Sequence, residues 1–290
     1  MKKLLALVLV SLLALSLVAC GGNTTTSNET NTNTTTSSDL QTIKNAGVLK
    51  VGMECDYAPY NWTQTTESET TVKLADGTYA DGYDVRIAKK IADALGVKLE
   101  IVKTSWDGLL PALTSGKIDA IIAGMSPTEE RKVTIDFTDT YYDSTLVLVV
   151  LKDGKYASAT KLSDFSGAKV TGQLDTFHYT VIDQIEGVDK QAALETFPDM
   201  IVALSSGKID AYVSELPGAK SAQVSNSNLS YVQFADGEGF KCDPSDSSIA
   251  VGIRKGSDLN DEINKVLATI SQDERDEIME SALKDQPVAE

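Results

Sequence analysis

The sequence is short of positive charge. Its 290 residues contain 26 Lys and Arg but 42 Asp and Glu, so the formal net charge is −16. Nucleic-acid binding needs surplus Lys and Arg for phosphate contacts, and adsorption to anionic lipid needs them for the headgroups. The charge balance therefore argues against both partners. The hydrophobic share of 42% is ordinary for a globular protein, and the length suits one large domain or two smaller ones.

Long apolar runs are also lacking. The one extended stretch, residues 4–18, follows the basic residues Lys2 and Lys3 and is too short to span a bilayer comfortably. It leads into the letters LVAC, and small residues before a cysteine at this place resemble the lipobox of bacterial lipoproteins. The resemblance implies that residues 1–20 are a lipoprotein signal peptide and that Cys20 carries lipid after cleavage. An ordinary secretory signal is the alternative.

Residues 23–38 contain no Leu, Ile, Val or Phe. Such a tract cannot bury enough apolar area to offset the entropy that is lost on ordering. We therefore expect residues 21–38 to form a flexible tether between the lipid and the globular part. A lipid followed by a tether predicts a protein that is anchored at the cell membrane and works in the aqueous phase on its extracytoplasmic side.

Cysteine and histidine are scarce. With Cys20 assigned to lipid, Cys55 and Cys242 remain, and an even pair in an exported chain suggests a disulfide. Two buried free thiols are the alternative. The one histidine, His178, falls in a predicted helix and is interpreted as structural. No nucleophile–base pair and no metal-ligand spacing is visible, so we expect no catalytic residue, metal or cofactor.

One local pattern occurs twice. The letters ALTSGKIDA at residues 112–120 return as ALSSGKIDA at residues 203–211, with eight of nine positions identical. Each copy ends an amphipathic helix, supplies a glycine where a left-handed cap is wanted, and continues into a short apolar run suited to a buried strand. A favourable helix-to-strand turn used by chance is the alternative explanation, but it does not account for the parallel surroundings.

Further strands and helices alternate around the two copies. Strands are expected at residues 48–53 and 98–104 in the first half and at 167–174 and 193–197 in the second. Helices are expected at residues 82–96 and 177–185. Alternating strands and helices indicate open, mostly parallel sheets, and two similar sets indicate two α/β lobes.

The residues beyond the two repeated strands are the natural place to look for a site. Ligands bind outside the carboxyl ends of strands in open parallel sheets. AGMSPTEER follows the first repeated strand and leads to Arg131, whereas Glu215 follows the second. A guanidinium in one lobe and a carboxylate in the other could hold opposite ends of a zwitterion.

At this level of detail the chain resembles a known family. The stretches YAPYNW, GYDVRIAKKIADALG, WDGLLPALTSGKIDAIIAGMSPTEERK, IDFTDTYY, SGAKVTGQLDT and SIAVGIRKGS run in order over residues 47 to 280. They resemble the extracytoplasmic amino-acid-binding proteins of ABC importers, the polar-amino-acid solute-binding family, family 3. The resemblance implies a type II periplasmic-binding-protein-like fold, in which two α/β lobes joined by two hinge strands hold the ligand in the cleft.

The family fold implies that the chain crosses between the lobes twice. We place the crossings near residues 143–145 and 240–248. Lobe 1 is then residues 39–143 plus 249–290, and lobe 2 is residues 144–248. The resemblance further implies a monomer that has no enzymatic activity and delivers its amino acid to the transmembrane subunits of an ABC permease.

The resemblance also assigns roles to individual residues. Arg131 matches the residue that grips the ligand α-carboxylate, and a guanidinium fork suits that group. Gly124 and Ser126 match positions that bond the α-amino group and carboxylate, and Glu215 matches the acid that pairs with the α-ammonium. Tyr57 and Trp106 match aromatic positions that would sandwich the ligand side chain. Thr176 approximates a hydroxyl contact, although Asp175 stands where the family usually has glycine and Phe177 where it has a small residue.

The identity of the ligand depends on one further position. Glu54 matches an acid that receives the side-chain cation in binders of basic amino acids, which favours Lys or Arg. Glutamine or another polar amino acid is the alternative. A sensor module that signals to a membrane partner and an enzyme like cyclohexadienyl dehydratase are the alternatives from other functional classes.

Overall fold

The structure, a computed structural model, describes residues 38–287, and its strands form three sheets. The two larger sheets have the strand orders β6-β1-β7-β14-β8 and β11-β10-β12-β9-β13. In each of them the first three strands are parallel, the fourth is antiparallel to both neighbours, and the fifth runs with the first three. The predicted fold class, two α/β lobes of one design, is confirmed.

The strands have the following bounds. The first sheet contains β1 (Val48–Met53), β6 (Lys98–Lys103), β7 (Ala120–Ile121), β8 (Ile135–Asp143) and β14 (Ser248–Arg254). The second contains β9 (Leu146–Leu151), β10 (Lys169–Thr171), β11 (Asp189–Lys190), β12 (Ala211–Glu215) and β13 (Leu229–Val232). A small third sheet is formed by β2 (Asp56–Tyr57), β3 (Asn61–Gln64), β5 (Tyr79–Asp81) and β4 (Val72–Lys73).

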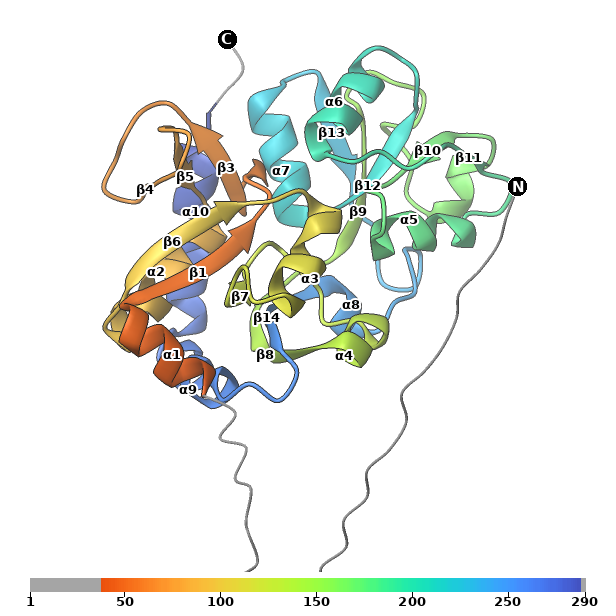
Figure 1. The fold of residues 1–290 in the computed structure, drawn as a ribbon. Helices are drawn as coiled ribbons and strands as arrows, with labels where there is room; N and C mark the ends of the chain where they lie inside the picture. The colour runs from red at the N-terminus through yellow and green to blue at the C-terminus, as the bar shows by residue number, and fades with distance from the viewer. Residues whose placement is uncertain (1–37, 288–290) are drawn as a thin grey trace, which may run out of the picture. The chain divides into compact units, whose positions relative to one another are not determined.

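The helices also form two groups, one beside each of the two larger sheets (Figure 1). Those with the first sheet are α1 (Asp39–Ala46), α2 (Tyr83–Leu95), α3 (Trp106–Thr114), α4 (Glu129–Thr134), α9 (Leu259–Leu267) and α10 (Gln272–Asp285). Those with the second are η1 (Leu162–Phe165), α5 (Phe177–Thr180), η2 (Val181–Gln184), α6 (Phe197–Ser205) and α7 (Leu216–Ser225), and α8 (Pro244–Ser247) precedes β14. In residues 38–287 we find no helix with both the length and the apolar content needed to traverse a bilayer.

The repeated motif occupies the same place in both sheets. It ends α3 and leads into β7 in the first copy, and it ends α6 and leads into β12 in the second, and these strands hold the central position of their sheets. Gly116 and Gly207 both have a positive φ, 75° and 72°. This left-handed conformation, which glycine adopts without a steric penalty, closes each helix.

The aspartate of the motif makes the same kind of hydrogen bond in both copies. Asp119 accepts a hydrogen bond from the backbone N–H of Lys50 in β1 at 2.9 Å, and Asp210 accepts one from Lys169 in β10 at 2.8 Å. Each aspartate thus accepts a hydrogen bond from a backbone N–H near the start of the neighbouring parallel strand. The repeated segment thus links the end of a helix to the neighbouring strand by a hydrogen bond, once in each lobe.

The chain passes between the large sheets twice. Two residues separate β8 of the first sheet from β9 of the second, and the return runs from β13 through α8 to β14. The Ser144 N–H donates to the Ser247 carbonyl at 3.1 Å, so the two connections lie side by side. Each crossing delivers the one strand, β9 or β14, that runs against its sheet. In Figure 1 the blue strand β14 accordingly lies beside the green strand β8.

Most expected elements are present, with two differences in the second lobe. The expected helix at 177–185 is divided into α5 and the 3-10 turn η2. The strand expected at 193–197 is wrong, because the outer strand is the earlier β11. Only Leu194 of the expected stretch bridges Gln173, and Thr196 caps α6 by accepting from the Asp199 N–H. β11 is a polar edge strand with no apolar pattern to reveal it. The signal peptide, Cys20 and residues 21–37 lie outside the described residues.

Replacing either repeated aspartate by alanine should destabilise the protein. Asp119→Ala and Asp210→Ala each remove one hydrogen bond to a backbone N–H of an exposed residue, which should lower the free energy of unfolding by about 0.5–1.5 kcal/mol. Urea unfolding would measure the loss. Asp→Asn at the same positions keeps one oxygen and should retain part of the stability. Lys117→Ala and Lys208→Ala, at exposed positions of the same motif, serve as controls. Aspartate variants as stable as these lysine variants would contradict the proposed role.

Candidate ligand-binding site

The segments that follow β7 and β12 meet at one small cavity. It measures about 20 Å³ and is lined by Tyr57, Trp106, Gly124, Ser126, Arg131, Gln173, Thr176, Phe177, His178, Glu215 and Asp246. Seven of the eight residues predicted to bind ligand are in this set, and the eighth, Glu54, lines the adjoining pocket that shares Trp106. The matching positions of the two strands therefore bring the predicted residues together across the two lobes.

Arg131 lies at one end of the cavity, on the first turn of α4. Its Nη1 donates to the Ser126 carbonyl at 2.9 Å, its Nη2 donates to the Asp175 carbonyl at 3.3 Å, and its guanidinium lies 5.0 Å from the ring centroid of Trp106. These partners are all neutral. Burial lowers the pKa of Arg131 to about 10, which still leaves it charged at neutral pH. The guanidinium is therefore a desolvated cation that is suited to receive an anion.

Glu215 lies at the other end, as the last residue of β12, and is 2% exposed. Its Oε1 is 2.7 Å from His178 Nε2, and its Oε2 accepts a short hydrogen bond from the Tyr57 hydroxyl. Burial alone would raise the pKa of Glu215. The charge and hydrogen bond of His178, together with the hydrogen bond from Tyr57, outweigh that effect, so the pKa falls below its ordinary value. Glu215 is thus an ionised carboxylate at neutral pH.

The aromatic residues are arranged differently from the predicted sandwich. One face of Tyr57 stacks on Phe197 of the second lobe, with centroids 3.9 Å apart and planes 6° apart. Gly124 has a φ of 61°, and a Cβ there would stand 3.1 Å from Cε1 of Tyr57, so this position needs glycine for both reasons. Tyr57 is therefore held between Gly124 and Phe197, while Trp106 covers Arg131.

Thr176 and Asp175 form the lobe 2 wall of the cavity. The Thr176 hydroxyl donates to the Gln173 carbonyl at 2.7 Å, within its own turn. Asp175 has a φ of 55°, which is unusual for a residue with a side chain. This conformation accompanies a carbonyl that accepts from both Trp106 Nε1, at 3.3 Å, and Arg131. The backbone of the turn, more than the Thr176 hydroxyl, faces lobe 1.

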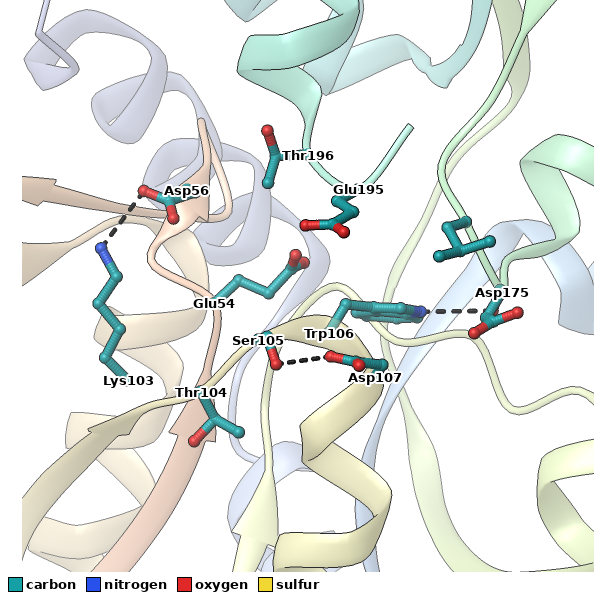
Figure 2. A pocket seen from close by; sticks show the side chains of 11 residues that line it. Glu54, Asp56, Lys103, Thr104, Ser105, Trp106, Asp107, Asp175, Glu195 and Thr196 are labelled. Carbon is teal, nitrogen blue, oxygen red and sulfur yellow. Dashed lines mark hydrogen bonds and ion pairs between the residues drawn. The ribbon is translucent and has the colours of Figure 1, made fainter. Parts of the chain in front are cut away.

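A larger pocket of about 420 Å³ adjoins the cavity (Figure 2). Its charged residues are the carboxylates Glu54, Asp56, Asp107, Asp175 and Glu195 and the single cation Lys103, which pairs with Asp56 at 3.4 Å. The pocket thus carries a surplus of negative charge. An opposite charge is attracted to such a concave, low-dielectric surface.

Glu54 is the most buried acid of this pocket, with 5% of its surface exposed. Its Oε1 accepts from Gln173 Nε2 of lobe 2 at 3.1 Å, whereas its Oε2 has no hydrogen-bond partner within residues 38–287. Burial raises the pKa of Glu54 to about 7, an effect that the hydrogen bond from Gln173 opposes and the charges of nearby acids increase. An acid in this position gains from a cationic partner.

A buried polar network shapes the turn that carries Glu54. Cys55 has a φ of 58°, and its N–H donates to Asn61 Oδ1 at 2.7 Å. Asn61 Nδ2 and the Tyr141 hydroxyl donate to the two oxygens of buried Asp84, at 2.8 and 2.7 Å. Burial raises the pKa of Asp84 to about 6, despite these two donors.

The cysteines do not form the disulfide that was one of the two expectations. Cys55 is buried and Cys242 is exposed, and neither is disulfide-bonded within the described residues, 38–287. The alternative of two buried thiols therefore holds for Cys55 alone. Burial raises the pKa of the Cys55 thiol to about 12, so this thiol stays protonated and unreactive.

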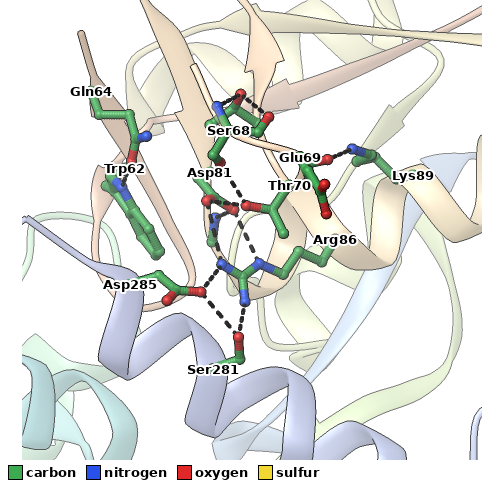
Figure 3. Close-up of polar contacts among 12 residues, drawn as sticks. Trp62, Gln64, Ser68, Glu69, Thr70, Asp81, Arg86, Lys89, Ser281 and Asp285 are labelled. Atoms are coloured by element: carbon green, nitrogen blue, oxygen red, sulfur yellow. Dashed lines mark hydrogen bonds and ion pairs between the residues drawn. The ribbon is translucent and has the colours of Figure 1, made fainter. Parts of the chain in front are cut away.

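The end of α10 joins a polar network of lobe 1 that is centred on Arg86 (Figure 3). Arg86 of α2 donates to Asp81, to Ser281 and to Asp285, at 3.1, 2.9 and 2.9 Å, and so fixes α10 to lobe 1. The next residue, Gln286, is 5% exposed, and its side chain contacts Ser221 of α7 in lobe 2. The last turn of α10 thus bridges the lobes outside the cavity.

Sequence reasoning missed several residues of the site. His178 was interpreted as structural, yet it contacts Glu215 directly. Gln173 and Glu195 approach Glu54 from lobe 2, and Phe197 covers Tyr57. His178 stands two residues after Thr176, so its position in the turn beyond β10 was an available signal.

Two α/β lobes with oppositely charged groups facing each other across a cavity define a binding protein of the type II periplasmic class. The family described as bacterial extracellular solute-binding proteins, family 3, matches residues 49–284. The chain belongs to this family.

Individual relatives agree with this assignment. A probable histidine-binding protein of Campylobacter jejuni is 35% identical over 270 residues, which are 91% of this chain and 92% of that protein. An amino acid ABC transporter substrate-binding protein from Streptococcus pneumoniae, solved with L-arginine, has a TM-score of 0.75 at 30% identity and covers 87% of this chain and 100% of its own. The ancestral amino-acid-binding protein AncCDT-1, described as a precursor of cyclohexadienyl dehydratase, has a TM-score of 0.69 at 30% identity, with coverage of 85% and 100%.

The raised pKa of Glu54 predicts a pH-dependent stability. Because the folded-state pKa is about 7 and the ordinary value is 4.5, the folded protein holds a proton that the unfolded chain has lost between these values. The free energy of unfolding should therefore fall as pH rises from 4.5 to 7. Glu54→Gln removes this loss, so it should stabilise the ligand-free protein by about 1–3 kcal/mol at pH 8 and much less at pH 5.

Thermal unfolding at the two pH values would measure this difference. Asp56→Asn, two residues away and exposed, is the matched control. The difference in stability between this variant and wild type should not change comparably between the two pH values. An advantage of Glu54→Gln that is equal at pH 5 and pH 8 would show that burial of the charge is not its cause.

Proposed function

We propose that the protein binds a free amino acid outside the cell and delivers it to an ABC permease. The observation that carries the proposal is that a desolvated guanidinium, Arg131, and an ionised carboxylate, Glu215, both line one cavity. An α-amino acid presents a carboxylate and an ammonium separated by one carbon atom. Arg131 would receive the carboxylate, with Gly124 and Ser126 beside it, and Glu215 would receive the ammonium.

We further propose that the side chain of the ligand is basic, as in arginine or lysine. The unpartnered Oε2 of Glu54 and the surplus of carboxylates in the adjoining pocket support a cation there. Trp106 lines both spaces and would contact the ligand between its two ends. The arginine in the Streptococcus pneumoniae structure and the name of the Campylobacter jejuni relative are consistent with a basic ligand.

A neutral polar ligand such as glutamine is the second candidate, and one observation favours it. With a pKa of about 7, Glu54 is partly protonated at neutral pH and could donate a hydrogen bond to an amide oxygen. A sensor role uses the same binding step and differs only in the membrane partner. Similarity to AncCDT-1 links the fold to a dehydratase, but AncCDT-1 itself is described as an amino-acid-binding protein, and we propose no catalysis for this chain.

The proposal extends to the organisation of the whole chain. Lobe 1 comprises residues 39–143 and 249–290 and lobe 2 residues 144–248, and the lobes separate to admit the ligand and close around it. Lipid on Cys20 and the tether at 21–38 would hold this monomer near its permease at the cell membrane. Support for the lipid anchor comes from the sequence pattern alone.

Removing the guanidinium should abolish ligand binding without unfolding the protein. Arg131→Ala leaves the ligand carboxylate desolvated and unpaired, which costs about 3–5 kcal/mol, or at least a hundredfold in affinity. Calorimetry with L-arginine would measure the loss. Lys132→Ala is the matched control, because Lys132 pairs with Glu129 and not with the cavity. An Arg131→Ala affinity within threefold of the control would contradict the assignment.

Glu54→Gln should discriminate between ligands. The substitution keeps the shape and one acceptor but removes the charge, so binding of L-arginine or L-lysine should weaken by about 2–5 kcal/mol. Binding of L-glutamine should lose only about 1 kcal/mol, the value of one hydrogen bond. The comparison is made between ligands on one variant, which cancels any general change in stability. Equal weakening for all three ligands, or no wild-type binding of a basic amino acid, would favour the neutral ligand instead.

A further inference from the structure

Both oxygens of Glu215 are already used by the protein. His178 Nε2 contacts Oε1 at 2.7 Å, and the Tyr57 hydroxyl donates to Oε2. The cavity in front of them measures about 20 Å³, so the ammonium of an amino acid cannot reach Glu215 unless a protein group yields. The question is which of the two groups changes when ligand binds.

Tyr57 and His178 differ in what they can change. Burial raises the pKa of the Tyr57 hydroxyl well above its ordinary value, an effect that the charge of Glu215 increases. Tyr57 therefore remains a neutral donor that can only move. An imidazole can instead be neutral or cationic near physiological pH. His178 can thus alter the charge beside Glu215 without leaving its place.

The surroundings of His178 make its charge depend on Glu215. The residue is 7% exposed, and its second ring nitrogen, Nδ1, is buried and finds no hydrogen-bond partner in the part of the chain that the structure describes. The ring packs edge-on against Phe197, with centroids 6.0 Å apart. A desolvated imidazolium is costly unless an opposite charge stands next to it. In the absence of ligand, Glu215 provides that charge.

We propose that His178 is a built-in cation which the ammonium group of the ligand replaces, so that amino-acid binding is coupled to release of a proton from His178. The inference rests on the proposed function only in requiring an ammonium at Glu215. When the ammonium arrives, a protonated His178 would place two cations against one carboxylate. Loss of the Nδ1 proton to solvent removes this repulsion, and the neutral ring can still donate Nε2–H to Glu215.

The other charged groups around the cavity favour the same direction of change. Arg131 on α4 is a second cation, and the ligand carboxylate that would balance it arrives together with the ammonium. Asp246 on α8 lines the same cavity but makes no ion pair with His178 among residues 38–287. Tyr57 on β2 is neutral, and Asp84 is hydrogen-bonded to Asn61 and Tyr141. Glu215 on β12 is thus the one carboxylate in contact with the ring.

The proposal can be tested by direct titration, because the chain contains a single histidine. In protein prepared without a histidine tag, the two carbon-bound protons of the His178 ring give a single set of imidazole NMR signals. Their chemical shifts would be followed over pH 5–8, first without ligand and then with saturating L-arginine. We expect the titration midpoint to move to lower pH by at least one unit when L-arginine is present.

Calorimetry provides the second measurement. Each pH unit by which L-arginine lowers the His178 midpoint makes binding of L-arginine about tenfold weaker at a pH below both midpoints than at a pH above both. Titrations in two buffers of different ionisation enthalpy count the protons released. His178→Gln, which keeps a neutral N–H donor, should reduce that number relative to wild type. Lys132→Ala is the matched control, because Lys132 pairs with Glu129 outside the cavity, and it should release as many protons as wild type.

The outcomes separate the inference from the proposed function. If L-arginine fails to bind at pH 8, the basic-ligand proposal fails, and the same titration with L-glutamine then tests the inference. If L-arginine binds and the His178 midpoint stays or rises, only the inference is overturned. Proton release that His178→Gln leaves unchanged would equally overturn it.

Discussion

The structure depends on one constraint: two charged groups, the partly buried Arg131 and the buried Glu215, line one cavity without forming an ion pair with each other. A desolvated charge is costly unless polar groups surround it. The protein supplies substitutes on each side. Arg131 donates to two carbonyls and lies over Trp106, and Glu215 accepts from Tyr57 and contacts His178. These substitutes hold the charges in place but, among the described residues, give the guanidinium no anionic partner, which is what the proposed binding of a zwitterion requires.

The two lobes serve this constraint by being copies of one design. Because β7 and β12 occupy the same position in their sheets, the loops beyond them emerge at equivalent edges. The repeated aspartates, Asp119 and Asp210, set the register of the incoming strand in each copy. Identical frames with different loops then present a cation from one lobe and an anion from the other. Function is thus determined by the loops, and the frame determines their mutual placement.

The sequence predicts the frame well and the contacts between lobes poorly, for a physical reason. Helix and strand periodicity and the glycine caps are local, so α2 and the repeated units could be located from their own letters. Arg131 and Glu215 could be identified because they follow apolar strands. The contact of His178 with Glu215 and the stack of Tyr57 on Phe197 join residues from separate segments and depend on how the lobes meet. The short polar strand β11 carries no periodic signal, so the sequence points to residues 193–197 for the outer strand, whereas the structure has it at Asp189–Lys190.

The backbone conformation at Asp175 has a consequence for flexibility. A residue with a Cβ visits a φ of 55° at some cost but has few other conformations available, whereas glycine adopts many. Holding the Asp175 carbonyl toward Trp106 and Arg131 therefore loses less chain entropy than a glycine loop would. A glycine at this position would lose more conformational entropy when the same backbone conformation is fixed on folding, so the side chain at Asp175 limits the number of conformations available to this wall of the cavity.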